Sequence, residues 1–473
     1  MNYKGIIFFL GVFLFIISAF SILNILYSFY FDFFLGLNSY LITFIISILV
    51  GSLFCFIGYK NHQNISLSEQ IIFILLSFLF LPLLISIPYY LSIYGVNLLD
   101  SYFEAVSGVT ATGFSILHNV SEIDEPLILW RSSSQWLGGL LFLTALIGTF
   151  GTKQIRIKPS FLISGGNSGN NFYSNFNYNF IKILLIYFLS TVFIIFLYKL
   201  VNVRLLDSVN LAFTTVSSGG FVPSNELSNI ITQNLQIFVL AISFLFPILN
   251  FYFLFNIFTK QFNLKNDQED LHLLILTFLL TLIFYFFLIP QKDFVNIFLA
   301  ITSSISTSGI FIQTSYEDLS LFFILLTFVG GSLISTSSGF KYVRIYMLLK
   351  ISHQEIYRLV KPINVFDKNL FNTESKIDDN DLKIAFLVFI SFIVSLFILS
   401  SILSLDIISF ENSFKLSILT LTNTVNSSIY GLDNISFFDL NTFTKLSLIF
   451  FMILGKIEII AILYLVKKFI FRK

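Results

Sequence analysis

The chain of 473 residues is 56% hydrophobic and only 11% charged, with a mean hydropathy of +0.88 and a formal net charge of +1. A water-soluble protein of this length needs far more charged surface, so the composition excludes a soluble globular protein and predicts a membrane protein. The single cysteine, Cys55, excludes an intrachain disulfide and a cysteine-based metal site, and the four histidines are too scattered to predict a zinc or iron centre.

Ten apolar segments are long enough to cross the hydrocarbon core of a bilayer, which takes about 20 residues. The first is too long for a secretory signal and has no small-residue cleavage site, so we interpret it as a span. The distribution of Lys and Arg between the connecting segments predicts a multi-pass protein of the bacterial inner membrane with a cytoplasmic N-terminus. The predicted spans lie near residues 5–30, 37–59, 70–94, 129–150, 178–200, 232–258, 271–289, 318–347, 382–404 and 443–470.

Four stretches rich in Ser, Thr and Gly each follow one predicted span and precede another, all on the outer side. They are too short to cross a membrane and too apolar for ordinary solvated loops. They read AVSGVTATGFS (105–115), FTTVSSGGFVP (213–223), TSSISTSGIFI (302–312) and LTLTNTVNSSI (419–429). This recurrence predicts an all-α polytopic membrane protein with two N-terminal helices followed by four repeats of helix, re-entrant segment and helix. The predicted units are 1–66, 67–160, 161–262, 263–362 and 363–473, with a flexible linker at 164–179 and the longest cytoplasmic loop at 351–381.

The fourth stretch departs from the other three. The first three share a hydroxyl residue followed by a glycine three positions later: Thr110 and Gly113, Ser217 and Gly220, Ser306 and Gly309. In the fourth we align Asn426 with the glycines, because Asn423 then keeps the three-residue offset and because asparagine enters left-handed conformations readily. The alternative is Gly431, which needs a longer re-entrant segment.

Four re-entrant segments around one axis supply what a cation pore needs. Non-helical backbone at membrane depth is tolerated only where it lines water or is buried in protein. Backbone carbonyls can replace the hydration shell of a cation, each short helix directs the negative end of its dipole toward the centre, and glycine permits positive φ. One such stretch would be ordinary packing between helices, but four with a shared pattern predict a pore for monovalent cations, with potassium as the first choice.

Five motifs carry a resemblance to a known family. They are YFEAVSGVTATGF (102–114), WRSSSQWLGGL (130–140), AFTTVSSGGF (212–221), GGSLISTSSGFKYVR (330–344) and LGKIE (454–458). With them the chain resembles, over nearly its whole length, the TrkH/KtrB/HKT superfamily of potassium transporters and most closely its TrkH branch. The resemblance implies potassium uptake through a selectivity filter, with K⁺ at Thr110, Ala111, Thr112, Gly113, Ser217, Ser218, Gly219, Gly220, Ser306, Thr307, Ser308, Gly309, Asn423, Thr424, Val425 and Asn426.

A run of Gly, Ser and Thr at 330–340 interrupts an otherwise apolar helix, at a cost of about 1 kcal/mol for each glycine. The resemblance implies that this break is an intramembrane loop that gates the pore below the filter. Lys341 and Arg344 either anchor the cytoplasmic end of the helix or take part in gating or partner docking, and Lys456 stands where the family usually has arginine. The predicted gate residues are Gly330, Gly331, Ser335, Thr336, Gly339, Lys341, Arg344 and Lys456.

The resemblance further implies a homodimer with one pore in each subunit, bound to a cytosolic nucleotide-binding regulatory subunit of the TrkA type. No covalent cofactor and no nucleic acid partner are expected. A sodium-selective or sodium-coupled transporter of the same superfamily stays open as an alternative, as does a scaffold subunit that has lost conduction. A membrane-embedded enzyme is disfavoured, because the chain has no intramembrane Ser/His pair, HExxH motif or paired acids on one helix.

Overall fold

The computed structural model describes residues 3–60, 67–117, 119–150, 176–258, 268–288, 293–312, 319–360, 369–371, 377, 379–406, 408–432, 435–457 and 468. Every regular element in these ranges that is longer than one residue is a helix, and the predicted all-α fold class is confirmed. The predicted linker lies outside the described residues as far as residue 175, while residues 176–179 form the start of a helix.

Long apolar helices make up the frame of the molecule. Among the described residues, six helical stretches are long and apolar enough to cross a membrane, which fits a multi-pass membrane protein. Several hydroxyl side chains inside them bond to their own helix, as when Thr43 donates to the Ser39 carbonyl at 2.8 Å, which satisfies these polar groups within the helix. The six are α1 (Tyr3–Tyr30), α2 (Leu37–Gly58), α3 (Leu67–Tyr90), α8 (Phe176–Leu200), α13 (Gln268–Ile283) with the π-helical turn η3 (Phe284–Leu288), and α17 (Asp379–Leu403).

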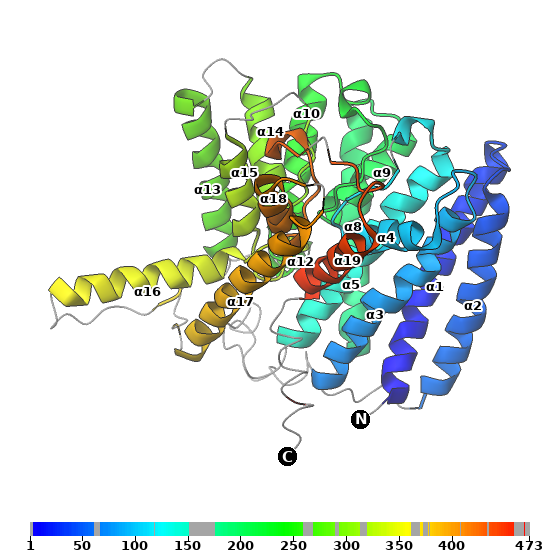
Figure 1. Cartoon of the computed structure of the whole chain (residues 1–473), viewed down its shortest axis with the longest axis horizontal. Coiled ribbons are helices and arrows are strands. Elements are labelled where there is room, and N and C mark those ends of the chain that lie inside the picture. The colour runs from blue at the N-terminus through cyan, green and yellow to red at the C-terminus, as the bar shows by residue number, and fades with distance from the viewer. Residues whose placement is uncertain are drawn as a thin grey trace.

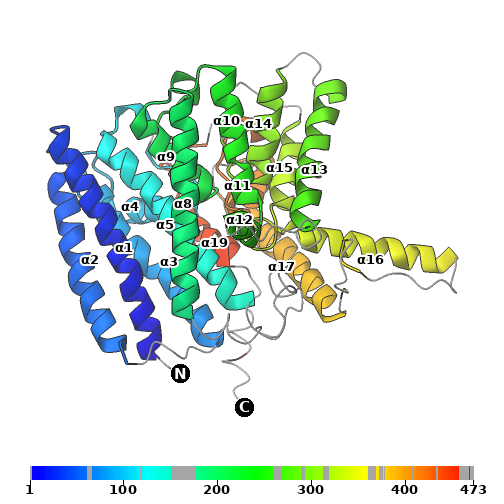
Figure 2. The ribbon, with the colours of Figure 1, turned by 180° about the vertical axis from the view of Figure 1, so that it is seen from behind.

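The N-terminal pair α1 and α2 lies side by side at one edge of the molecule (Figures 1 and 2). Small residues allow this close approach: a Cβ atom at Gly11 would lie 2.9 Å from the carbonyl oxygen of Gly51, and one at Gly58 would lie 2.4 Å from that of Lys4. The pair packs on α3 and on α5 (Glu125–Phe150), which places it outside the remaining helices as two additional spans.

Four short helices occupy the interior, each in sequence between two longer helical stretches. Each has 12 residues and is therefore about 18 Å long, too short for a hydrocarbon core of about 30 Å. Side-chain caps mark the start of the first and the last of them; in the first, the Asn97 side chain accepts a hydrogen bond from the Asp100 amide at 2.8 Å. They are α4 (Leu98–Val109), α9 (Leu205–Val216), α14 (Phe294–Ile305) and α18 (Phe410–Leu421).

Two predicted spans are interrupted. The stretch 232–258 is divided into α10 (Asn234–Ser243), α11 (Leu245–Ile248) and α12 (Phe251–Phe258). The stretch 318–347 consists of α15 (Ser320–Val329), a non-helical loop at 330–341 and the start of α16 (Tyr342–Val360). The second interruption, at 330–341, therefore lies where the run of glycines and serines predicts a break in the helix.

Helix α16 corrects the predicted cytoplasmic loop. Residues 351–360, assigned to that loop, continue the helix, which is supported on its surface by an Arg358–Glu355 ion pair of 2.7 Å. The helix projects sideways from the body of the molecule (Figures 1 and 2). Its mixture of charged and apolar residues suggested a loop, although the apolar ones recur at helical spacing.

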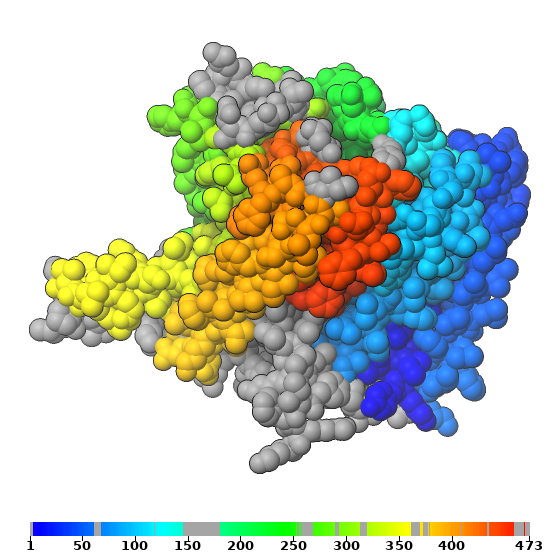
Figure 3. Space-filling view, viewed as in Figure 1, coloured from blue at the N-terminus to red at the C-terminus, as the bar shows by residue number. Residues whose placement is uncertain are grey.

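The C-terminal part of the chain covers the centre of one face. In the space-filling view, α17, α18 and α19 (Thr442–Ile457) lie across the middle of the molecule, between α16 and the N-terminal helices (Figure 3). The remaining short elements are the 3₁₀ turns η1 (Val120–Glu122), η2 (Leu227–Asn229) and η5 (Ser428–Tyr430).

Candidate ion-conduction site

The four short helices end in one shared backbone pattern. After each helix comes one cap residue and then a residue in the left-handed region, with φ of 57°, 53°, 61° and 49° at Ala111, Ser218, Thr307 and Asn423. The next amide donates to a carbonyl five positions earlier: Thr112 to Ser107 (2.9 Å), Gly219 to Thr214 (2.8 Å), Ser308 to Ser303 (3.0 Å) and Thr424 to Leu419 (2.9 Å). This pattern makes residues 110–113, 217–220, 306–309 and 422–425 equivalent, and we name them segments 1 to 4.

The last residues of the four segments meet. A Cβ atom at Gly113 would lie 2.7 Å from the Gly220 Cα, one at Gly220 would lie 2.4 Å from the Val425 Cβ, and one at Gly309 would lie 3.0 Å from the Val425 carbonyl oxygen. Residues that are far apart in the sequence therefore form a single close-packed group. We call Gly113, Gly220, Gly309 and Val425 the central ring.

Our alignment of Asn426 with the glycines is wrong by one residue, because Val425 takes that position. Asn423 lies in the left-handed position that follows the cap residue Thr422, and asparagine is one of the few residues that adopt it readily. Val425 is not in the left-handed region, so a β-branched side chain fits there without backbone strain. The sequence contains the asparagine but does not reveal that, in segment 4, the residue with positive φ lies two positions before the ring.

Both residues that we had considered for the fourth position lie outside the ring. The Asn426 side chain donates from Nδ2 to the Leu432 carbonyl at 3.2 Å. A Cβ atom at Gly431 would find only the Lys415 ammonium group within 4 Å, at 3.8 Å, so nothing packs closely against that glycine. The alternative alignment on Gly431 is therefore also wrong.

Side-chain hydrogen bonds join neighbouring segments. Asn423 donates from Nδ2 to the Thr112 hydroxyl at 3.0 Å and so links segments 4 and 1, and the Ser308 hydroxyl donates to the Gly219 carbonyl and links segments 3 and 2. Within segment 1 the hydroxyls of Thr110 and Thr112 share a hydrogen bond of 2.7 Å. These bonds lie in the interior, where they hold the four backbones in register.

The loop at 330–341 contacts the ends of the short helices directly. Thr336 donates from its hydroxyl to the Val216 carbonyl at 2.8 Å and accepts a hydrogen bond from the Ser218 hydroxyl at 3.2 Å through its own carbonyl. The Ser338 amide donates to the Thr307 hydroxyl at 2.9 Å. The loop is therefore bonded to the second and third segments, next to the central ring.

Two buried lysines bind the same loop. Lys341, at the end of the loop, donates to the Ser337 carbonyl at 2.5 Å, and Lys456, from α19, donates to the Ser338 hydroxyl at 3.1 Å. Their ammonium groups lie 5.4 and 4.5 Å from the centre of the Phe142 ring of α5, within cation–π range. The loop, α5 and α19 therefore meet around the two lysine side chains.

Burial corrects one predicted role for the basic residues after the break. Lys341 is 1% exposed and Arg344 is 4% exposed, and Arg344 donates to the Phe340 carbonyl at 3.2 Å. Neither side chain is available to a soluble partner in this conformation, so docking of a regulatory subunit through them is not supported. The contacts of Lys341 and Arg344 fit best with a role in holding the loop in place.

Further contacts hold residues 332–334 of the loop against α11, α12 and α13. The Ser332 amide donates to the Ile248 carbonyl at 2.8 Å, and the Phe251 amide donates to the Ile334 carbonyl at 2.7 Å. Glu269, at the start of α13, accepts a hydrogen bond from the Leu333 amide at 2.8 Å. The break between α11 and α12 thus exposes backbone groups that the loop needs, which gives the interruption a structural reason.

Comparison with known proteins finds relatives over almost the whole chain and a solved structure with the same fold. No family model matches the chain. The crystal structure of the potassium transporter TrkH from Vibrio parahaemolyticus superposes over 100% of both chains with a TM-score of 0.84 at 19% identity. The chain has the TrkH fold. An uncharacterized cation transporter of Methanocaldococcus jannaschii is 26% identical over 98% of this chain and 95% of its own, and the Trk system potassium uptake protein TrkG of Escherichia coli is 24% identical over 92% and 91%. The predicted resemblance to the TrkH branch is confirmed.

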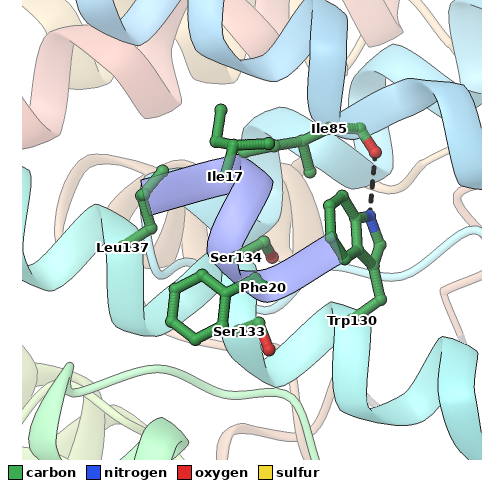
Figure 4. A pocket seen from close by; sticks show the side chains of 7 residues that line it. All are labelled: Ile17, Phe20, Ile85, Trp130, Ser133, Ser134 and Leu137. Atoms are coloured by element: carbon green, nitrogen blue, oxygen red, sulfur yellow. Dashed lines mark hydrogen bonds between the residues drawn. The ribbon is translucent and has the colours of Figure 1, made fainter. Parts of the chain in front are cut away.

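Within this TrkH fold, the small cavity in Figure 4 is a packing gap. It lies between α1, α3 and α5, has a volume of about 10 Å³ and is lined by Ile17, Phe20, Ile85, Trp130, Ser133, Ser134 and Leu137. The polar groups around it are already paired; the Trp130 indole, for example, donates to the Ile85 carbonyl at 3.0 Å. A volume of this size is about the least that holds one water molecule, so the cavity is not a ligand site.

A buried ion pair that the sequence analysis did not single out supports segment 1 of the TrkH fold. Arg131 of α5 donates from Nε to Glu104 of α4 at 3.0 Å, and both side chains are at most 3% exposed. Glu104 also accepts from the Ile116 amide at 2.8 Å, and the Arg131 guanidinium lies 4.2 Å from the centre of the Phe221 ring. The pair thus fixes the backbone just after Gly113. The sequence did contain a signal for this pair: one acidic and one basic residue lie inside otherwise apolar motifs, where burying a charge costs free energy.

Replacing Arg131 with methionine is expected to destabilise the protein by about 3–5 kcal/mol, because it leaves the Glu104 carboxylate buried without its partner. The measurement is thermal unfolding of the purified protein in detergent. Arg358→Met is the matched control: it breaks the exposed pair with Glu355, which is worth at most about 1 kcal/mol. Equal melting temperatures of the two variants would contradict a supporting role for the Arg131–Glu104 pair.

Proposed function

We propose that the chain takes up potassium across the bacterial inner membrane through a selectivity filter made of segments 1 to 4. The observation that carries this proposal is the central ring: four segments with one backbone pattern meet at the C-terminal ends of four short helices. The negative ends of those helix dipoles favour a cation at the centre, and backbone carbonyls can replace its hydration shell. The names of the relatives, which describe cation transport and potassium uptake, agree with it.

The filter residues in this proposal differ slightly from the initial set. Segment 4 comprises Thr422, Asn423, Thr424 and Val425, so Thr422 is added and Asn426 is removed. The other members are unchanged: Thr110, Ala111, Thr112, Gly113, Ser217, Ser218, Gly219, Gly220, Ser306, Thr307, Ser308 and Gly309.

We further propose that the loop at 330–341 gates this pore. It bonds to segments 2 and 3, and it brings the ammonium groups of Lys341 and Lys456 close to the inner end of the filter. A buried lysine ammonium group next to the path opposes the entry of a cation, since repulsion is strong where water is excluded. Opening then requires the loop to leave its contacts with Val216 and Thr307. The proposed gate residues remain Gly330, Gly331, Ser335, Thr336, Gly339, Lys341, Arg344 and Lys456.

The proposed assembly is a homodimer, with one pore in each subunit, bound to a cytosolic nucleotide-binding subunit of the TrkA type. Relatives named as components of a Trk system support an association with further components. The proposed orientation has a cytoplasmic N-terminus. Co-purification from a host that expresses both proteins tests the association, and the mass of the purified protein in detergent tests the dimer.

Rubidium uptake decides between the candidate functions. We expect purified protein in liposomes to take up ⁸⁶Rb⁺ faster than empty liposomes, and external K⁺ to compete better than Na⁺. Better competition by Na⁺ would favour the sodium-conducting alternative. Uptake no faster than that of empty liposomes, with the protein inserted, would contradict conduction and favour the scaffold alternative.

A further inference from the structure

We propose that the Val425 side chain sets the width of the central ring and limits the passage of cations the size of potassium or larger. This inference rests on the proposed function, since it concerns the same path. Three members of the ring are glycines, which place only hydrogen atoms toward their neighbours. The fourth places an isopropyl group in the same layer.

The position of the isopropyl group follows from its neighbours. A Cβ atom at Gly220 would lie 2.4 Å from the Val425 Cβ and 3.0 and 3.1 Å from its two Cγ atoms. A Cβ atom at Gly309 would lie 3.0 Å from one of those Cγ atoms. The valine side chain therefore points toward segments 2 and 3, across the ring, and not outward into the surrounding helices.

Exposure supports the same arrangement. Val425 is half-buried, whereas Gly113, Gly220 and Gly309 are buried. The valine is therefore the relatively most exposed member of the ring. An apolar side chain offers no ligand to a cation that has left its hydration shell, so an ion at this level must pass the valine or wait for it to move.

The rest of segment 4 keeps the structure of the other segments. The hydroxyls of Thr422 and Thr424 share a hydrogen bond of 3.0 Å, like that between Thr110 and Thr112, and Asn423 donates to the Met452 carbonyl at 2.9 Å. Segment 4 is therefore an intact segment that carries one additional side chain, and not a collapsed remnant. Because the backbone of Val425 is not left-handed, glycine and alanine both fit there without a change of backbone.

A series of substitutions at this position tests the inference in liposomes. Val425→Gly is expected to raise ⁸⁶Rb⁺ influx by about tenfold or more, which corresponds to a barrier lowered by about 1.4 kcal/mol. Val425→Ala is expected to give an intermediate influx, and Val425→Thr, whose side chain has nearly the same width as valine, to raise influx less than Val425→Ala does. Asn426→Gly is the matched control, because it removes a side chain one residue outside the ring; its influx is expected to equal that of the unmodified protein.

The outcomes separate this inference from the proposed function. If the unmodified protein conducts and Val425→Gly conducts equally fast, the width inference is wrong and the proposed function stands. If Val425→Thr is as fast as Val425→Gly, the polarity of the side chain and not its width sets the rate, which also overturns the inference. If neither the unmodified protein nor any variant conducts, both fail. If Val425→Gly is not monodisperse in detergent, the comparison of Val425→Ala with Val425→Thr decides. Faster influx through Val425→Ala supports the inference, and equal influx overturns it.

Discussion

Gly220→Asp is expected to lower potassium or rubidium uptake by about 100-fold or more, which corresponds to a barrier raised by about 2.7 kcal/mol. Gly220 lies in the central ring, and even a Cβ atom there would come within 2.4 Å of the Val425 Cβ, a distance that real Cβ atoms do not reach. The carboxylate adds a charge among groups that must release each ion after binding it. An ion held too tightly at one site blocks those that follow. The measurement is growth and ⁸⁶Rb⁺ uptake in a host that lacks its own potassium uptake systems.

Gly95→Asp is the matched control for this substitution. Gly95 has a positive φ of 65°, but a Cβ atom there would have no neighbour within 4 Å, and aspartate is enriched among the non-glycine residues that adopt positive φ. This variant is expected to retain uptake. Normal uptake by a well-expressed Gly220→Asp protein would remove Gly220 from the ion path and leave the central ring without a role in conduction.

Local features of the chain were predictable from its sequence. Apolar length predicts the long helices, and the run of Gly, Ser and Thr predicts the break after Val329, because both depend on residues that are adjacent in the sequence. Each of the three glycine-containing stretches could be recognised because the same pattern recurs in the other two. The fold class follows from these features, and it is confirmed.

Register and long-range partners were not predictable in the same way. The register of segment 4 could not be read from the residue types, since both Asn423 and Asn426 tolerate positive φ and either could stand for a residue of the glycine-containing stretches. Hydrogen bonds to α18, the bond from Asn423 to Thr112 and the contact of Val425 with Gly220 fix the register, and these need the folded chain. The bond between Lys456 and Ser338 likewise joins residues that are 118 positions apart, and the sequence offers no periodicity that would pair them.

Deleting residues 332–339 is expected to raise basal ion flux by about tenfold or more, because this segment bonds to Val216 at the end of α9 and to Thr307 of segment 3, next to the proposed path. The deletion is geometrically feasible. The Tyr342 amide donates to the Gly331 carbonyl at 3.1 Å, and the Phe340 amide donates to the Phe328 carbonyl at 2.9 Å, so the two ends of the loop already lie next to each other. Joining Gly331 to Phe340 therefore leaves α15 and α16 close to their positions. The measurement is ⁸⁶Rb⁺ influx into liposomes in the absence of any other protein.

A milder substitution serves as the second arm of this test. Thr336→Val keeps the shape of the loop but removes the hydroxyl that donates to the Val216 carbonyl, so it is expected to raise basal flux less than the deletion does. Ser92→Ala is a suitable control, because its hydroxyl makes a comparable bond to the Tyr89 carbonyl at 2.6 Å in a turn far along the chain from the loop. If the deletion protein is inserted and its flux is unchanged or lower than that of the unmodified protein, the loop does not close the pore. In that case Lys341 and Lys456 stabilise the fold through their bonds to the loop, and the barrier to conduction lies at the central ring.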